Sequence, residues 1–320
     1  MTGTLEQRPF GRTGETVSVI GLGGAALHKH SYQHGLDTVK HALDLGISYF
    51  DTSPLYGIGG PDGRWISRGE SQRIVGEGLE GTSKPHLLAT KIGASQASNH
   101  TVEDCLAEVR DNLRILRRDQ VDVLQGHDME QRRVWKPEAN TGELLEIDEP
   151  LDYENAPVMQ ALREAKAQGF CRYLGLSSNR SEPLAHVMQQ VKLDMCLSTN
   201  EYSLMDRRSP PVMLPVIREQ GAAYLIGGIF CVPGKGVVNG ALFKDEHLLE
   251  LARATGISIA ALSVRFLIAN KELSTILVGA STPEELEESV VAAQAGPLPP
   301  DIQQTLEELQ PQTVAWENRN

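Results

Sequence analysis

The sequence predicts an α/β protein built as one closed barrel, in which eight parallel strands alternate with helices in a (β/α)8 arrangement. Short apolar runs alternate with stretches of helical periodicity down the 320 residues, and no linker rich in Pro, Ser or charge divides them. The length agrees, since barrels of this kind often exceed 250 residues as one unit. We therefore expect a single barrel domain over 1–320.

The expected strands follow an N-terminal hairpin around Gly11 and Gly14. They cover 17–24, 47–51, 86–92, 121–128, 172–177, 195–199, 222–229 and 274–279. Helical periodicity falls between them, over 38–45, 102–116, 156–168, 183–191, 211–220, 246–255, 258–270 and 282–293. Gly46 has the place of a C-cap glycine after the first of these helices. A C-terminal helix and tail are expected over 294–320.

Three connections are longer than plain turns, and they follow strands two, four and seven. They cover 57–69, 129–155 and 227–240. Loops that follow strands lie on the catalytic face of a TIM barrel, so all three are expected there. The inserted loop 129–155 carries a dense acidic cluster between 138 and 154, which indicates a solvated surface loop, a substrate lid or a subunit contact.

Charge and hydropathy restrict the partners of the protein. A net charge of −12 and a pI near 5.3 argue against nucleic acid and anionic membrane surfaces. The first residues contain no apolar signal segment, and no later apolar run approaches the roughly 18 residues of a membrane span. We expect a cytoplasmic protein that acts on small molecules, as a monomer or an oligomer.

The four cysteines are widely spaced and match no zinc-binding pattern, so no metal site is expected. We expect reduced core thiols at Cys105, Cys171, Cys196 and Cys231.

Four polar residues stand at or just after the ends of strands two, three and four. The apolar run 47–51 ends at Asp51, and Tyr56 follows after a turn, while Lys91 and His127 end the next two runs. Taken singly, each has an ordinary explanation: a turn acid, a loop aromatic, a lysine reaching solvent and a core histidine. Because strand ends meet on one face of a barrel, the coincidence of all four favours a functional cluster.

A competing interpretation starts from the glycines after the first strand. Residues 21–26 satisfy the relaxed dinucleotide fingerprint G-x-G-x-x-A, and Asp51 would then bind a ribose. That architecture needs a separate substrate domain, whereas the alternation of strands and helices continues to Ala293. The barrel is therefore the favoured interpretation.

Three segments together resemble the aldo-keto reductase superfamily, over about residues 10–293. They are 50–57 (FDTSPLYG), 89–93 (ATKIG) and 124–128 (LQGHD). Within that superfamily, the first segment and the adenosine segment described below are similar to the NAD-dependent aldose 1-dehydrogenase branch, which includes L-fucose and L-galactose dehydrogenases. The resemblance implies an oxidoreductase that moves a hydride between a nicotinamide cofactor and a carbonyl carbon.

Such a transfer needs a group that gives or takes a proton at the oxygen. Tyr56 suits this role if the ammonium of Lys91 lowers the pKa of its phenol from about 10. Asp51 would hold Lys91, and the resemblance implies that His127 orients the substrate oxygen.

The resemblance also implies a nicotinamide dinucleotide across the mouth of the barrel. Ser177, with Ser178 or Asn179, and Thr199 would hold the carboxamide, and Tyr224 would stack on the ring. Gly227 and Lys235 would approach the pyrophosphate, with a flexible surface loop as the alternative explanation of that segment. The adenosine end would meet Gly279, Ser281, Glu285, Glu288 and Ser289.

The adenosine segment favours NAD over NADP. Relatives that prefer NADPH carry a lysine and an arginine where this chain has Gly279 and Glu285. A glutamate repels a 2′-phosphate and accepts a hydrogen bond from a ribose hydroxyl. Thr282 and Glu285 also form a capping-box pattern, so Glu285 has a structural role whether or not it meets the cofactor.

The expected function is an NAD-dependent aldose dehydrogenase of carbohydrate metabolism, with a sugar or small alcohol as substrate. The alternatives are an NADPH-dependent aldehyde or ketone reductase and a cofactor-sensing regulatory subunit. Trp65, Trp135 and Trp316 fall in expected loops or the tail, where they would wall the pocket or pack the loops down.

Overall fold

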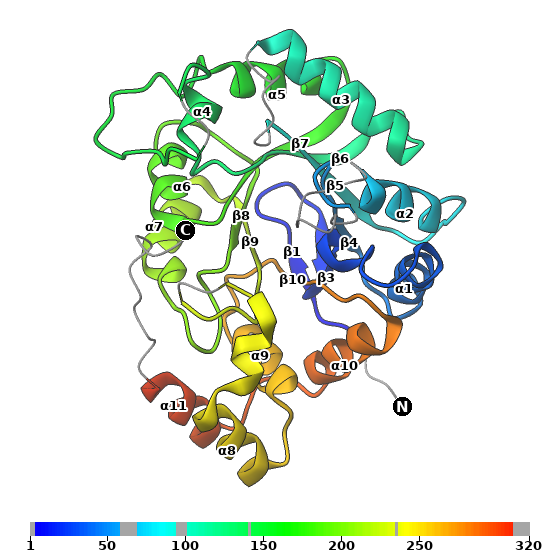
Figure 1. Ribbon diagram of the computed structural model, residues 1–320, viewed down its shortest axis with the longest axis vertical. Coiled ribbons are helices and arrows are strands. Elements are labelled where there is room, and N and C mark those ends of the chain that lie inside the picture. Colours follow the sequence, from blue (N-terminus) through cyan, green and yellow to red (C-terminus); the bar gives the residue numbers. More distant parts are fainter. Residues whose placement is uncertain (1–3, 58–68, 94–100, 140–141, 234–235, 310–320) are drawn as a thin grey trace.

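The computed structural model describes residues 4–57, 69–93, 101–139, 142–233 and 236–309. Within these residues, eight parallel strands close into a barrel surrounded by helices, which confirms the predicted (β/α)8 class (Figure 1). The last strand pairs with both the first and the seventh, which closes the ring. The barrel strands are β3 (Ile20–Gly23), β4 (Tyr49–Asp51), β5 (Leu87–Ile92), β6 (Val121–Gly126), β7 (Cys171–Ser178), β8 (Met195–Thr199), β9 (Ala223–Gly227) and β10 (Thr275–Val278).

The helices of the outer ring follow these strands. They are α1 (Tyr32–Asp44), α2 (Glu70–Gly78), α3 (Val102–Leu116), α5 (Pro157–Ala167), α6 (Ser181–Met188), α7 (Ser209–Gln220), α9 (Ile259–Ile268) and α10 (Pro283–Gln294). Further helical segments lie in the loops and after α10, namely η1 (Gly24–Ala26), α4 (Arg132–Trp135), η2 (Val238–Lys244), α8 (Glu246–Thr255) and α11 (Pro300–Glu308).

Local sequence explains where several of these helices begin. Thr101 and Asp104 form a reciprocal capping box at the start of α3, and the Ser31 side chain caps α1. Helix α2 was not predicted, because its nine residues contain two glycines and only two large apolar side chains. Gly76 is required there: a Cβ atom would lie 2.4 Å from the Leu116 carbonyl oxygen of α3.

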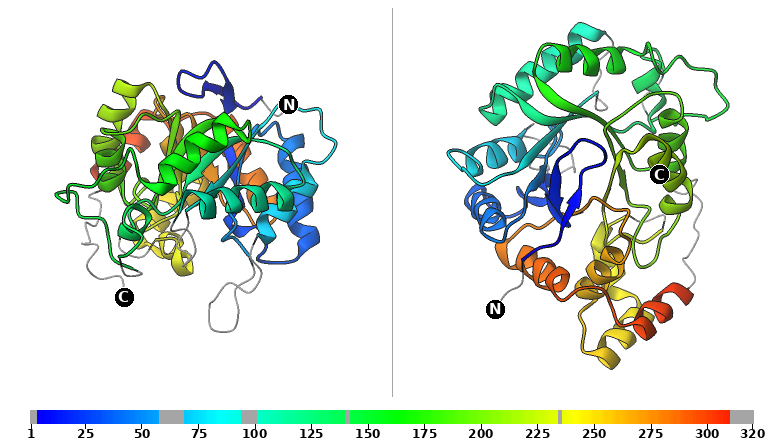
Figure 2. Two further views of the ribbon diagram at one scale, coloured as in Figure 1. Left: turned by 90° about the horizontal axis from the view of Figure 1, so that it is seen from above. Right: turned by 180° about the vertical axis from the view of Figure 1, so that it is seen from behind.

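An antiparallel hairpin of β1 (Gln7–Pro9) and β2 (Thr16–Ser18) lies across one end of the barrel (Figure 2). The expected strand 17–24 is therefore two strands, β2 in the hairpin and β3 in the barrel. Phe10 and Val17 join the inward-facing apolar side chains, and the Phe10 ring lies 5.6 Å from that of Tyr49. Apolar side chains fill this end of the barrel, so any site must lie at the opposite end, where the strands finish.

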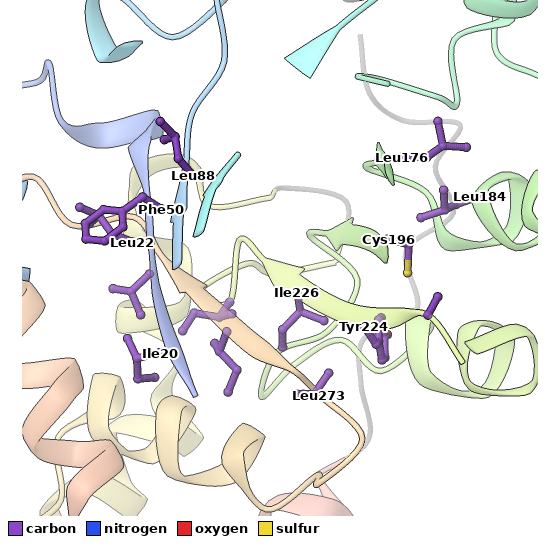
Figure 3. Close-up of a cluster of buried hydrophobic side chains, with 14 of the residues drawn as sticks. Ile20, Leu22, Phe50, Leu88, Leu176, Leu184, Cys196, Tyr224, Ile226 and Leu273 are labelled. Atoms are coloured by element: carbon purple, nitrogen blue, oxygen red, sulfur yellow. The ribbon is translucent and has the colours of Figure 1, made fainter. Parts of the chain in front are cut away.

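Side chains of the strands alternate between two apolar layers. Tyr49, Leu197 and Leu225 belong to the cluster inside the barrel. Their neighbours in sequence, such as Phe50 and Ile226, pack outward in the layer between strands and helices (Figure 3).

The four cysteines are unpaired and buried, which confirms the expected core thiols. Among the described helices none alone has the length and apolar character to cross a membrane. One pair does meet that criterion jointly, α8 with α9, bent by 87° between them.

Candidate active site

A cavity of about 250 Å³ opens where the barrel strands end. Its lining includes residues at the end of each of the eight strands or one position before or after it. Asp51, Tyr56, Lys91 and His127 all line it, so the structure brings together the four residues that the sequence singled out.

A buried ion pair forms the floor of this cavity. The Lys91 ammonium donates to one carboxylate oxygen of Asp51 and to the Thr52 carbonyl oxygen, the latter at 2.9 Å. Gln125 Nε2 donates to the other Asp51 oxygen at 2.7 Å. Burial disfavours the charge on Lys91, but the carboxylate of Asp51 more than compensates and raises the pKa of Lys91. Lys91 is therefore an ammonium at neutral pH.

The phenol of Tyr56 lies beside this ammonium. The Lys91 Nζ atom is 5.1 Å from the centre of the Tyr56 ring. Burial raises the pKa of Tyr56 and outweighs Lys91, which lowers it through its charge and a hydrogen bond; Asp51 and Asp128 raise it further. The expectation of a lowered phenol pKa is therefore wrong for this structure. Lys91 acts in the expected direction, but Tyr56 stays protonated at neutral pH.

His127 is neutral, because burial and the charge of Lys91 lower its pKa to about 3. The Ser53 hydroxyl oxygen lies 3.2 Å from His127 Nδ1 and accepts a hydrogen bond from the Leu55 backbone N–H. The hydroxyl hydrogen is then available to Nδ1, and a bond donated in this way would place the ring proton on Nε2. The sequence analysis missed Ser53 and Gln125. A signal existed for Ser53, which lies two residues after Asp51 in the same loop.

A second buried network supports the opposite wall. Glu130 accepts hydrogen bonds from the Ser178 hydroxyl at 2.8 Å, the Asn179 backbone N–H at 3.1 Å and Asn179 Nδ2 at 2.8 Å. Asn179 Oδ1 accepts from Thr199 Oγ1 at 2.8 Å and Asn200 Nδ2 at 2.9 Å. Burial raises the pKa of Glu130. The sequence analysis did not identify Glu130, whose role depends on contacts 48 residues away.

The wall supported by Glu130 fits the nicotinamide end of a dinucleotide. Five of the predicted cofactor contacts line the cavity, namely Ser177, Ser178, Thr199, Gly227 and Gly279. Ser178, Asn179 and Thr199 present hydroxyl and amide groups suited to a carboxamide. A Cβ atom on Gly279 would meet nothing within 4 Å, so space is open beside that backbone. The rest of the dinucleotide would extend from this cavity across the open mouth of the barrel.

Tyr224 does not line the cavity, and its predicted stacking role is wrong. Its ring is fully buried in the layer outside the strands, and its hydroxyl lies 2.6 Å from Ser209 Oγ on α7. The neighbours Ala223 and Leu225 take the inward positions, because side chains alternate along β9.

Trp135 is not a cavity wall either. Its indole is buried, donates to the Met129 carbonyl oxygen at 2.8 Å and packs edge-on against Tyr153 at 5.0 Å. The indole therefore holds down the loop 129–155. Lys235, Trp65 and Trp316 lie outside the described residues.

The acidic cluster of the loop 129–155 is partly neutralised within the loop. Arg132 contacts Glu149 at 2.6 Å and Glu143 at 2.9 Å, and Lys136 contacts Glu149 at 3.4 Å. These ion pairs connect the short helix α4 with the chain that follows it.

The start of α10 confirms the capping role of Glu285. Its carboxylate accepts from the Ser281 backbone N–H at 2.8 Å and from the Ser281 hydroxyl at 2.7 Å, while the Thr282 side chain caps the helix. Glu288 accepts from Ser258 at the start of α9, and Ser289 is buried and bonded to the Glu285 carbonyl oxygen. The adenosine contacts of Glu288 and Ser289 stay predictions, and both side chains also make these helix-packing contacts.

Comparison with known proteins agrees with this geometry. L-galactose dehydrogenase of Arabidopsis thaliana is 28% identical over 308 residues, covering 90% of this chain and 88% of that protein. Pyridoxal 4-dehydrogenase of Microbacterium luteolum is 25% identical over 325 residues, covering 89% and 92%.

The fold is also that of a solved aldo-keto reductase from Bacillus halodurans in its holo form. The TM-score is 0.74 at 24% identity, over 99% of this chain and 100% of that chain. The sequence profile of the Aldo/keto reductase family matches residues 19–311. The chain therefore belongs to the aldo/keto reductase family, whose members are oxidoreductases of the NAD(P)-dependent type.

Proposed function

We propose that this protein is an NAD-dependent dehydrogenase that oxidises the C1 hydroxyl of a free aldose or a similar small alcohol. The observation that carries the proposal is the convergence of Tyr56, Lys91, Asp51 and His127 on one cavity. The names of two relatives support the reaction class, because both are dehydrogenases of compounds that carry an aldehyde or its hemiacetal.

Tyr56 is the proposed acid and base of the reaction. During oxidation the substrate C–H bond loses a hydride, and the hydroxyl proton passes to the oxygen of Tyr56, which must first have released its own proton to solvent and be a phenolate. A bound nicotinamide dinucleotide supplies the hydride acceptor. In the reverse direction the Tyr56 phenol donates its proton to the carbonyl oxygen as the hydride arrives. Lys91 favours the phenolate, and Asp51 and Gln125 keep Lys91 in position.

His127 is the proposed donor that orients the substrate oxygen. Its pKa of about 3 keeps the ring neutral at any physiological pH, and Ser53 donating to Nδ1 would leave the N–H on Nε2 for the substrate. Such a donor stabilises charge on the oxygen without competing with Tyr56 for the transferred proton.

Ser178, Asn179 and Thr199 would hold the carboxamide of the cofactor, and Glu285 favours NAD. Among the described residues at the start of α10, the side chains at the expected phosphate-binding positions are Gly279 and Glu285, which supply no cation. Glu284, in the same first turn, adds a second negative charge.

Initial rates with NAD and NADP, measured over a panel of free aldoses and pyridoxal, test this proposal. We expect the formation of reduced cofactor with NAD and at least one aldose. The reverse assay uses NADPH with simple aldehydes, and activity confined to that assay would assign the protein as a reductase instead. Tight cofactor binding without turnover of any substrate would favour the regulatory subunit.

A further inference from the structure

Asp128 is a cavity residue to which the proposed reaction gives no role. It follows His127 directly and lines the cavity together with Tyr56 and Lys91. Its φ of 54° lies in the left-handed region, which few residues other than Gly, Asn and Asp tolerate. The Gln131 backbone N–H donates to the Asp128 carbonyl oxygen at 2.8 Å, which fixes this turn. The backbone thus holds the carboxyl group at the edge of the cavity.

The carboxyl group of Asp128 has spare hydrogen-bonding capacity. Its Oδ1 atom lies 3.6 Å from His127 Nε2 and 3.5 Å from Asn179 Nδ2, and both distances are long for a hydrogen bond. Asn179 Nδ2 makes its short bond to Glu130 instead, at 2.8 Å. Oδ2 receives no hydrogen bond from the part of the chain that the structure describes. The side chain is only 20% exposed.

A buried acceptor that lacks a strong partner discriminates between ligands. A hydroxyl that reaches the carboxylate forms a charge-assisted hydrogen bond, while a ligand without that hydroxyl leaves the group desolvated and unpaired. Sites of this kind reject the analogue that lacks the hydroxyl more strongly than apolar pockets reject a missing methylene. Burial raises the pKa of Asp128, and the charges of Lys91 and Arg133 oppose that rise. Either protonation form keeps an oxygen that accepts a hydrogen bond from a hydroxyl.

We propose that Asp128 accepts a hydrogen bond from a second hydroxyl of the substrate and so selects polyhydroxylated compounds over those with a single oxygen. This inference rests on the proposed function, because it leaves the reacting oxygen to Tyr56 and His127. It adds the chemical class of the substrate: a vicinal diol or a sugar.

The competing role for Asp128 is to orient His127. The Ser53 hydroxyl already contacts the Nδ1 side of that ring at 3.2 Å, compared with 3.6 Å between Asp128 and Nε2. An orienting residue would affect every substrate equally, whereas a hydroxyl-binding residue would affect only substrates that carry the second hydroxyl. This difference makes the two roles separable.

The test compares D128N and D128G with the unmodified protein. Both replacements tolerate a left-handed backbone, so the turn is preserved. The substrates are a free aldose that the protein oxidises, its 2-deoxy counterpart, and 2-hydroxytetrahydropyran, a ring hemiacetal with no further hydroxyl. D152N is the matched control, because Asp152 lies exposed in the same loop and only accepts bonds from Asn155.

We expect D128N to lower kcat/KM for the aldose about 10- to 100-fold, and D128G to lower it at least as much. With 2-hydroxytetrahydropyran, kcat/KM should not fall, because this compound has no second hydroxyl and loss of the Asp128 charge removes one of the effects that raise the pKa of Tyr56. The dissociation constant of the cofactor should be unchanged in titrations without substrate. The 2-deoxy compound then shows whether the bound hydroxyl is that on C2.

Equal losses for the aldose and for 2-hydroxytetrahydropyran would overturn the role of Asp128 and leave the proposed function intact. If the unmodified protein oxidises neither compound with either cofactor, both proposals fail together.

Discussion

Two carboxylates of the proposed site, Asp51 and Glu285, show how differently the same group is used in one barrel. The Asp51 side chain is 3% exposed and bonded to Lys91 and Gln125, from two other strands. Glu285 is exposed, and its side chain bonds to Ser281 and to the Thr282 backbone, four and three residues away. The contacts of Asp51 form only when the barrel closes, whereas those of Glu285 would also form at the end of an isolated helix.

This difference determines what each carboxylate reveals about function. A buried ion pair is costly to desolvate, so its presence beside Tyr56 needs a reason beyond stability. Capping alone explains the contacts of Glu285. Glu285 indicates the choice of cofactor only because it stands where relatives that prefer NADPH carry an arginine. The catalytic half of the proposal, which assigns the residues around Tyr56, therefore rests on tertiary contacts. The cofactor half, which is the preference for NAD, rests on the charge of the side chain at position 285.

Replacing Tyr56 by Phe tests the catalytic half with the largest expected effect. The aromatic ring remains, but the hydroxyl that carries the proton is lost, so kcat should fall about 10²- to 10⁴-fold. Cofactor affinity, measured by fluorescence titration, should stay the same. Y153F is the matched control, since the Tyr153 hydroxyl is buried away from the cavity. A kcat in Y56F close to that of Y153F would remove Tyr56 from the mechanism.

Replacing Lys91 by Met tests whether Asp51 depends on its partner. The substitution leaves a buried carboxylate unpaired, which should cost about 3–5 kcal/mol in the free energy of unfolding. The double variant D51N/K91M should regain part of that loss. Denaturant unfolding measures both. Equal stability of K91M and the unmodified protein would show that the pair is open to water, contrary to its burial.

Replacing Glu285 by Arg tests the cofactor half and has the smallest expected effect. The preference for NADP relative to NAD, as a ratio of kcat/KM values, should rise roughly ten-fold, because repulsion is replaced by attraction at an exposed position. E285Q is the control, since it removes the charge while keeping an oxygen for Ser281. The same ratio in all three proteins would mean that Glu285 is only a cap.

Sequence predicted the parts of this structure that follow from periodicity and local signals. The barrel class, the bounds of α3 and the strand-end positions of Asp51, Lys91 and His127 all follow from patterns within single segments. Tyr224 was placed wrongly because the inward or outward direction of a strand residue depends on how the whole strand is set in the barrel.

Other features depended on partners distant in sequence. Gln125 and Glu130 act through contacts 74 and 48 residues away, which no local pattern specifies. The pKa of Tyr56 was misjudged because the effect of Lys91 is visible in the sequence, whereas the depth of burial is not.

The pH dependence of hydride transfer tests the central claim most directly. Burial raises the pKa of Tyr56 from that of an ordinary phenol, and oxidation requires the unprotonated form, so the rate should be low at neutral pH and rise with pH. In single turnovers of the proposed oxidation we expect a rise of about ten-fold per pH unit between roughly pH 7 and 9, with no further inflection, because His127 is already neutral. A flat profile over that range would contradict the assignment of Tyr56 as the proton acceptor.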